Sequence, residues 1–211
     1  MTNPHAEDLS GMLAARGIHD VASGLALARA DFMDFRHSLV DVVRGDFSQV
    51  SMGLLALITR AQGFFDGALK GVENDNPYAT FPLIRCYAEN AAVLLWILDH
   101  PNDLARLSSS ARPDERFAIG RLISNAAKRA KGFKAIYEQL SEFSHPVATG
   151  FHQPWRVVPD EERTLQWSSV PSFKTTEDKI WACFWLVELT EIHANVWPSA
   201  YRASVTSPVI T

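Results

Sequence analysis

The sequence is poor in cysteine and in long apolar runs. Its 211 residues include two cysteines, Cys86 and Cys183, and both stand in apolar stretches where a free thiol behaves as a small hydrophobic residue. This usage is not that of a disulfide-bonded secreted scaffold and indicates a reducing compartment. The N-terminus lacks the pattern of a signal peptide, and the longest apolar runs, 91–98 and 180–187, are shorter than the roughly 20 residues of a membrane-spanning helix. We therefore expect a cytoplasmic protein with no membrane partner.

Several motifs of common enzyme classes are also missing. The sequence has no Gly-x-x-x-x-Gly-Lys-Ser/Thr loop, no Gly-x-Gly-x-x-Gly after a strand, no Cys-x-x-Cys pair and no Gly-x-Ser-x-Gly elbow. Nucleotide-hydrolase, dinucleotide-dependent, structural-zinc and α/β-hydrolase functions therefore lack support. The net charge of -4 argues against a protein that binds polyanions over its whole surface, but it allows a local basic patch.

Helical periodicity, in contrast, covers most of the chain. Hydrophobic residues at 47% and charged residues at 21% are ordinary for a globular protein. The third and the last of the expected helices are apolar on every face, so both are predicted to lie at the centre of a bundle. The apolar spacing predicts helices over 18–42, 50–71, 77–99, 116–130, 133–144 and 175–196.

A change of pattern near 154–168 predicts a small β-hairpin, because two short runs rich in β-branched and aromatic residues flank Pro-Asp-Glu-Glu-Arg. The predicted fold class is all-α, a bundle of five or six helices with this hairpin as an insertion. The bundle domain is expected over 18–200, after an N-terminal extension, 1–17, and before a C-terminal tail, 201–211. Six tryptophans and twelve phenylalanines supply dense packing and can leave an apolar surface that pairs subunits, so we expect a homo-oligomer.

Three glycines on the second expected helix suggest how it ends and what it packs against. Gly63 and Gly67 are four residues apart, which would allow a neighbouring helix to approach closely. Gly71 is predicted to be the C-terminal cap of this helix.

A charged pair opens the third expected helix. Arg85 and Glu89 are one turn apart and share a face, which continues as the apolar residues Ala92, Val93 and Trp96. A carboxylate in apolar surroundings needs a partner, and such pairs mark functional sites. The alternative is an ordinary surface ion pair, which contributes little to stability.

The run Tyr-Glu-Gln-Leu-Ser-Glu-Phe-Ser-His-Pro holds a second candidate. Tyr137, Ser141 and His145 are spaced by four, so a phenol, a hydroxyl and an imidazole lie along one edge of the fifth expected helix. We interpret Arg85, Glu89, Tyr137 and His145 as candidate catalytic residues gathered at one site. Alternatively, His145 marks a helix C-terminus, where the helix dipole favours a cation and no chemistry is implied.

These motifs carry a family resemblance. An (Ile/Leu)-Arg-x-x-x-Glu pattern that opens an apolar helix, followed by Tyr-x-x-Leu-Ser-x-x-x-His-Pro, a hairpin and a closing apolar helix, resembles uncharacterised bacterial helical proteins. These are more distantly similar to the HEPN superfamily (higher eukaryote and prokaryote nucleotide-binding domains). The resemblance covers about 83–197. Many HEPN proteins are ribonucleases or toxins with an Arg-x(4 to 6)-His motif, which this sequence lacks, so the resemblance implies a relative that contacts nucleotide or is purely structural.

Basic residues gather in the fourth and fifth expected helices. No acidic residue occurs between Arg116 and Tyr137, in a chain that is acidic overall. Such residues, with Phe133 and Tyr137 beside them, can contact phosphate and stack a base, although a solvated helix face is the usual explanation. The candidate nucleic-acid-binding residues are Arg121, Lys128, Arg129, Lys131 and Lys134.

Carboxylates and histidines at metal-ligand spacing suggest a further hypothesis. Di-metal bundles use Glu-x-x-His motifs on two helices and single glutamates on two others. Chance alone would produce about one [Asp/Glu]-x-x-His spacing in this composition, so we expect no metal and no cofactor in the leading interpretation. The residues that would form such a centre are Asp34, His37, Glu142 and His145, with Glu89 and Glu188 as single ligands.

Three functions therefore remain open. The leading hypothesis is a HEPN-like bundle that contacts RNA or a nucleotide through a polar Arg/Glu/Tyr/His site. The second is a non-catalytic protein-interaction module of a bacterial defence or regulatory system, with a protein partner. The third is a carboxylate-bridged metal oxidoreductase.

Overall fold

The computed structural model describes residues 4–42, 48–104, 118–144, 154–157 and 165–206. This part of the chain is mostly helical, which confirms the predicted all-α class. Its helices are α1 (Pro4–Ala15), α2 (Val21–Val42), α3 (Gln49–Glu73), α4 (Pro77–Asp99), the short 3-10 helix η1 (Pro101–Asp103), α6 (Ile119–Arg129), α7 (Phe133–Ser144) and α9 (Thr176–Thr206).

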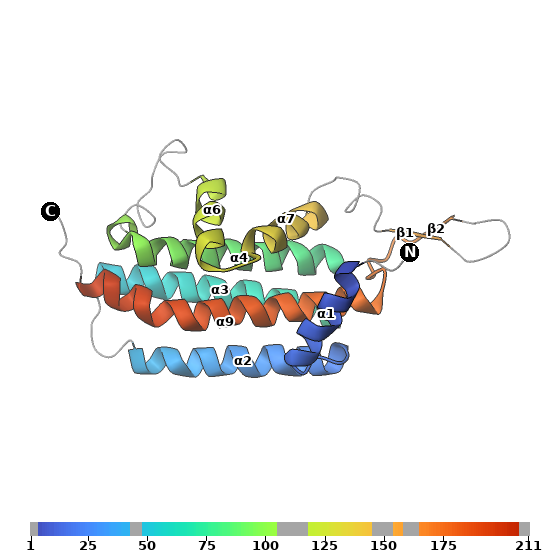
Figure 1. Cartoon of the computed structure of the whole chain (residues 1–211), viewed down its shortest axis with the longest axis horizontal. Coiled ribbons are helices and arrows are strands. Elements are labelled where there is room, and N and C mark those ends of the chain that lie inside the picture. The colour runs from blue at the N-terminus through green and yellow to red at the C-terminus, as the bar shows by residue number, and fades with distance from the viewer. Residues whose placement is uncertain (1–3, 43–47, 105–117, 145–153, 158–164, 207–211) are drawn as a thin grey trace.

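Four long helices, α2, α3, α4 and α9, lie side by side and form the bundle (Figure 1). The last helix, α9, packs against the other three, and α6 and α7 form a pair that covers the outer side of α4. More than half of the residues of α4 are buried. The two helices predicted to be apolar on every face are therefore central, because each has neighbours on several sides.

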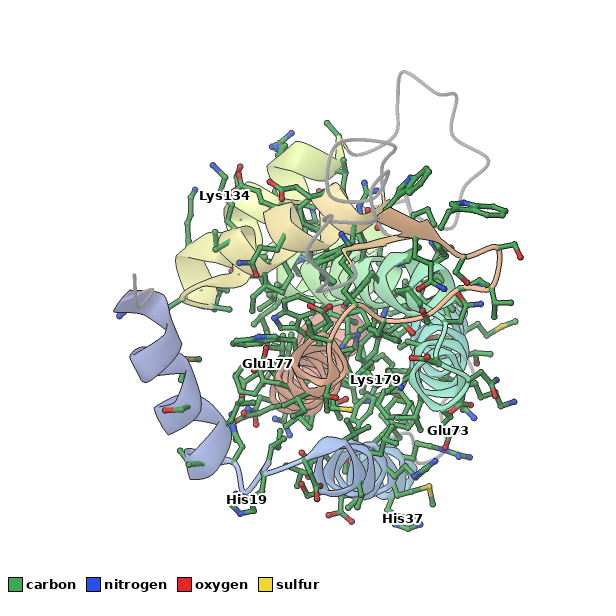
Figure 2. All side chains as sticks on the ribbon, turned by 90° about the vertical axis from the view of Figure 1, so that its right-hand side faces the viewer. His19, His37, Glu73, Lys134, Glu177 and Lys179 are labelled. Atoms are coloured by element: carbon green, nitrogen blue, oxygen red, sulfur yellow. The ribbon has the colours of Figure 1, made fainter. Side chains whose placement is uncertain are left out.

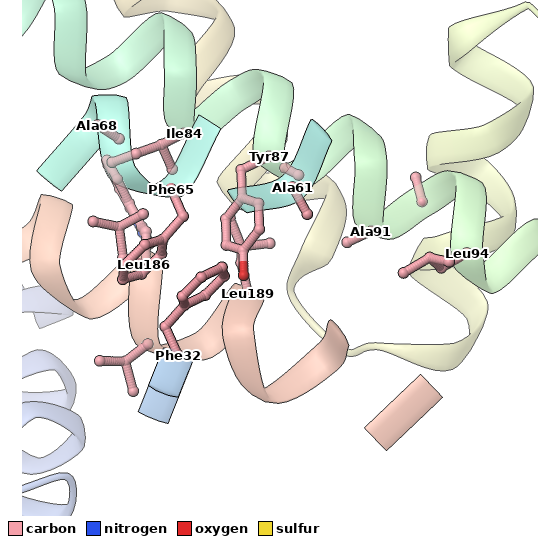
Figure 3. Packing of buried hydrophobic residues seen from close by; sticks show 14 of the residues in the cluster. Phe32, Ala61, Phe65, Ala68, Ile84, Tyr87, Ala91, Leu94, Leu186 and Leu189 are labelled. Carbon is pink, nitrogen blue, oxygen red and sulfur yellow. The ribbon is translucent and has the colours of Figure 1, made fainter. Parts of the chain in front are cut away.

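The core is rich in aromatic rings. Phe32 of α2 stacks on Phe65 of α3 with ring centroids 4.1 Å apart, and Phe65 meets Tyr87 of α4 edge to face at 6.0 Å (Figure 3). Cys183 is buried and Cys86 is half-buried. Burial raises the pKa of Cys183 to about 12 and raises the pKa of Cys86 as well. Both thiols thus stay protonated at neutral pH, in keeping with a role as small hydrophobic residues.

Side-chain caps fix the starts of several helices. Ser48 accepts a hydrogen bond from the amide of Ser51 at the start of α3, and Asn76 caps α4 in the same way. Thr175 and Asp178 bond to each other's backbone N–H groups at 3.1 and 3.2 Å, which confirms the capping box that their spacing predicts.

The glycines of α3 follow the prediction in part. Gly67 faces α4, and a Cβ atom there would lie 2.8 Å from Leu83 Cδ1, whereas Gly63 is exposed and a Cβ atom there would meet nothing within 4 Å. The closest approach to α4 is at Gly71, where a Cβ would lie 2.4 Å from the Thr80 hydroxyl oxygen and 3.0 Å from the Thr80 backbone nitrogen. Gly71 is not the cap, because α3 continues to Glu73 and Asn74 closes it.

A buried polar layer joins α4 to α9, and the sequence pattern gave no sign of it. The hydroxyls of Tyr87 and Thr190 are 3.0 Å apart, and Asn90 Nδ2 lies 3.2 Å from His193 Nε2. The His193 ring also stacks on Tyr87 at 4.3 Å. All four residues are buried, so water cannot bond to their polar groups, and these hydrogen bonds satisfy them instead.

The helix count and the hairpin differ from the prediction in detail. The described residues hold seven α-helices, one more than the upper count, because α1 forms within the predicted N-terminal extension. Strands β1 (Trp155–Val157) and β2 (Leu165–Trp167) pair antiparallel, with Trp155 opposite Trp167. The connection expected to close the hairpin lies outside the described residues.

Among the described helices, α4 alone is long and apolar enough in composition to cross a membrane. Its most apolar window has a mean hydropathy of 1.3, and 61% of that window is buried inside the structure. A central helix of a bundle passes the same test of length and hydropathy, because the neighbouring helices cover its surface and its residues can be apolar on every side.

Candidate functional site

The structure brings Arg85, Glu89 and Tyr137 together where α4 meets α7. The Arg85 guanidinium donates to the Tyr137 oxygen at 3.0 Å through Nη2, and the Tyr137 hydroxyl donates to Glu89 Oε1 at 3.0 Å. Arg85 Nε also lies 3.4 Å from Glu89 Oε1. These three residues, which we call the polar cluster, are half-buried, with 22% and 27% of the Arg85 and Glu89 side chains exposed.

Burial and charge set the protonation of the polar cluster. Burial works against the charged form of Arg85, but the hydrogen bond to Tyr137 and the charge of Glu89 outweigh it and raise its pKa. Burial raises the pKa of Tyr137, and the Glu89 charge adds to this, against the opposite effect of Arg85. At neutral pH the phenol therefore stays protonated and donates a hydrogen bond to the Glu89 carboxylate. Arg85 remains a cation, and its guanidinium carbon lies 5.3 Å from the centre of the phenol ring.

The remaining residues of the predicted catalytic edge contribute less. His145 lies outside the described residues, so its distance from Arg85 stays untested. The Ser141 hydroxyl donates to the backbone carbonyl of Tyr137 at 2.8 Å. This hydroxyl is thus occupied in its own helix, a common local bond of serine.

The predicted basic residues are exposed but unequal. Arg129 forms an ion pair with Asp99, and Lys134 lies 3.6 Å from Glu138. The Arg121 guanidinium lies over the Trp96 ring at 4.6 Å. The other two, Lys128 and Lys131, have no carboxylate partner in the described part of the chain.

One predicted stacking residue is buried. Phe133 is 2% exposed and belongs to the core, so it cannot stack a base, contrary to the prediction. Phe133 and Leu140 are seven residues apart and lie on the same side of α7, and both are buried against the bundle. Two exposed rings instead occur on the strand pair: Trp155 and Trp167, directly opposite each other, are 40% and 59% exposed. The sequence could have indicated this pair of exposed rings only if the register, which places Trp155 opposite Trp167, had been known.

The metal hypothesis gains no support from the geometry. No group of three or more His, Cys, Asp or Glu side chains lies close enough to hold a metal ion in the described ranges. His37 projects from α2, on the side of the bundle opposite Lys134 of α7 (Figure 2). Glu188 is half-buried and pairs with Arg16 at 2.7 Å, and Glu89 belongs to the polar cluster.

A groove of about 650 Å³ opens between α7 and α9, away from the polar cluster. Its lining includes Ile136, Gln139 and Phe143 of α7, whereas Tyr137 points from the other flank of that helix. Trp181 of α9 lines this groove and is half-buried. The groove was not predicted, because it depends on how α7 sits on α9.

Comparison with known proteins leaves the family open. No protein-family model, no curated protein and no solved structure matches the chain. The HEPN resemblance therefore stays a prediction.

Proposed function

We propose that this chain is a helical bundle that binds single-stranded RNA or a nucleotide on the face formed by α6, α7 and the polar cluster. One observation carries the proposal: Lys128 and Lys131 are exposed and have no carboxylate partner among the residues that the structure describes. Uncompensated lysines on an acidic protein attract phosphate groups, and each contact releases counterions from the nucleic acid.

Neighbouring side chains support the same surface. Lys134 stands one turn before Tyr137 on α7, and its pair with Glu138 is 63% exposed on both sides, so a phosphate can replace Glu138 at little cost. The guanidinium of Arg85, with its fork of donors, and that of Arg121, stacked on Trp96, suit phosphate contacts.

The untested predictions belong to this proposal. We propose a HEPN-like bacterial protein of the cytoplasm that forms a homo-oligomer. Its bundle domain spans 18–200 and includes a hairpin over 154–168. The antiparallel pairing of β1 and β2 supports the hairpin. The proposal is for binding, and a catalytic role of Arg85, Glu89, Tyr137 and His145 stays a prediction.

Reversing the two uncompensated charges is the direct test. We expect Lys128→Glu/Lys131→Glu to weaken binding of a short fluorescein-labelled single-stranded RNA by about tenfold or more, because two phosphate contacts become repulsive. Fluorescence anisotropy at two salt concentrations measures this, and the variant should show a shallower salt dependence.

A charge-matched variant separates a local site from net charge. Lys70→Glu/Lys174→Glu reverses two exposed lysines on other parts of the molecule and changes the net charge equally. It should change the affinity by less than about threefold. The proposal is wrong if both variants weaken binding alike, or if the unmodified protein binds neither RNA nor nucleotide at low salt.

The second candidate is a non-catalytic protein-interaction module. The hydrogen bonding of the polar cluster favours it, since Tyr137 bonds to both Arg85 and Glu89 without a ligand. Under this alternative, Tyr137→Phe lowers the free energy of unfolding by about 1 kcal/mol and leaves RNA binding unchanged. Under the proposed function, the same variant also weakens RNA binding, because Arg85 loses its positioning partner. Urea unfolding and anisotropy on one sample distinguish the two.

A further inference from the structure

The groove between α7 and α9 has an aromatic wall. Phe81 of α4 forms part of it, stacked on Phe143 at 4.1 Å, and both rings line the cavity. Trp181 of α9 lies beside Trp185, with ring centroids 5.9 Å apart. A volume of about 650 Å³ and a mostly apolar wall with a few polar groups are typical of small-molecule sites.

The charges around this wall are mainly negative. Glu142, Asp178 and Glu188 line the groove with a single cation, Lys131. Arg16 neutralises Glu188, whereas Asp178 accepts a hydrogen bond from a neutral backbone amide. Glu142 is exposed and has no ion-pair partner in the described part of the chain. The groove therefore keeps negative charge beside aromatic rings, and both features attract a cation.

A donor in the wall adds a second feature. Trp185 is 5% exposed and lines the groove, and its indole N–H forms no hydrogen bond with the described residues. This N–H is not among the buried polar atoms without a partner, so it is open to the groove and can donate to an acceptor oxygen of an occupant.

We propose that this groove binds a hydrophobic organic cation that carries an aryl group and a carbonyl oxygen. The ammonium group lies near Glu142 and the indole face of Trp181, and the carbonyl accepts from Trp185. The groove and the polar cluster lie on different flanks of α7, and the proposed RNA surface meets the groove at Lys131, which lines it.

The experiment compares three probes of similar shape. Phenacyltrimethylammonium is the cation, neopentyl phenyl ketone is its uncharged carbon isostere, and benzoylpropionate is the anion. Isotope-labelled protein is titrated with each, and the indole N–H resonances are followed after assignment with Trp181→Phe and Trp185→Phe. We expect the cation to shift the Trp181 and Trp185 resonances and to bind about tenfold or more tightly than the isostere.

Two matched variants locate the charge effect. Glu142→Gln should weaken binding of the cation by about three- to tenfold and leave the isostere unaffected. Glu138→Gln removes a carboxylate one turn away that does not line the groove, and it should change neither affinity. Equal binding of the cation and the isostere, preference for the anion, or shifts confined to other tryptophans would each overturn the proposal. RNA binding is not needed for any of these outcomes.

Discussion

Replacing Gly71 with alanine is expected to lower the free energy of unfolding by about 2 kcal/mol. The added Cβ would lie 2.4 Å from the Thr80 hydroxyl oxygen and 3.0 Å from the Thr80 backbone nitrogen. Thr80 is fully buried, and its hydroxyl donates to the Asn76 carbonyl at 2.9 Å, so the backbones of α3 and α4 must separate. Overpacking of this kind costs about 3 kcal/mol, and the better helix propensity of alanine returns about 1 kcal/mol.

Gly63→Ala is the control on the same helix. Gly63 is exposed, and its new Cβ would meet nothing within 4 Å, so alanine should stabilise the protein by about 0.5 to 1 kcal/mol. Urea unfolding followed by circular dichroism measures both variants. If both substitutions changed the free energy of unfolding in the same direction, the result would contradict a close crossing of α3 and α4 at Gly71.

These two glycines illustrate what the sequence could predict about the fold. Periodicity located α3 and α4 well, because each buries a wide apolar stripe. It suggested the approach at Gly67 but not that the closest contact is at Gly71, since Gly63, Gly67 and Gly71 follow one another at equal spacing along α3. The choice among them depends on where α4 turns back, which the turn at Asn74 to Asn76 decides.

The candidate site was predictable where its residues are close in sequence. Arg85 and Glu89 pair as their spacing on one helix predicts. Tyr137 joins them from another helix, which the resemblance suggested and the periodicity of α7 could not show. Phe133 was misplaced because an aromatic residue beside lysines is compatible with either face of a helix until the packing of α7 is known.

The polar layer between α4 and α9 should make the protein sensitive to acid. His193 is fully buried, its Nδ1 lies 2.7 Å from the Leu189 carbonyl oxygen, and its Nε2 lies 3.2 Å from Asn90 Nδ2. Because a carbonyl can only accept, Nδ1 carries the proton and Nε2 accepts from Asn90. A second proton on Nε2 would face the Asn90 donor in a buried site. Burial accordingly lowers the pKa of His193 to about 4, against the smaller opposite effect of the Leu189 carbonyl.

The sign of the effect follows from this lowered pKa. Between the ordinary histidine pKa of 6.5 and about 4, the unfolded chain binds a proton at His193 that the folded protein does not. Acidification through this window therefore lowers the free energy of unfolding, by about 3 kcal/mol in total. Asp20 and Asp99, whose hydrogen bonds to Ser23 and Arg129 lower their pKa values, lose their stabilising effect only below the ordinary value of 3.8.

Urea unfolding of the unmodified protein and of His193→Gln, at about pH 7 and about pH 4.5, tests this prediction. The unmodified protein should lose most of the 3 kcal/mol, about a third of the stability of a typical domain. His193→Gln should be less stable at neutral pH, because glutamine cannot stack on Tyr87 in the same way, yet it should change much less between the two conditions. His37→Gln replaces an exposed histidine on α2 and should keep the acid-dependent loss, since His193 is intact. An equal loss in His193→Gln would mean that other groups cause the acid sensitivity and that His193 is not held neutral in the core.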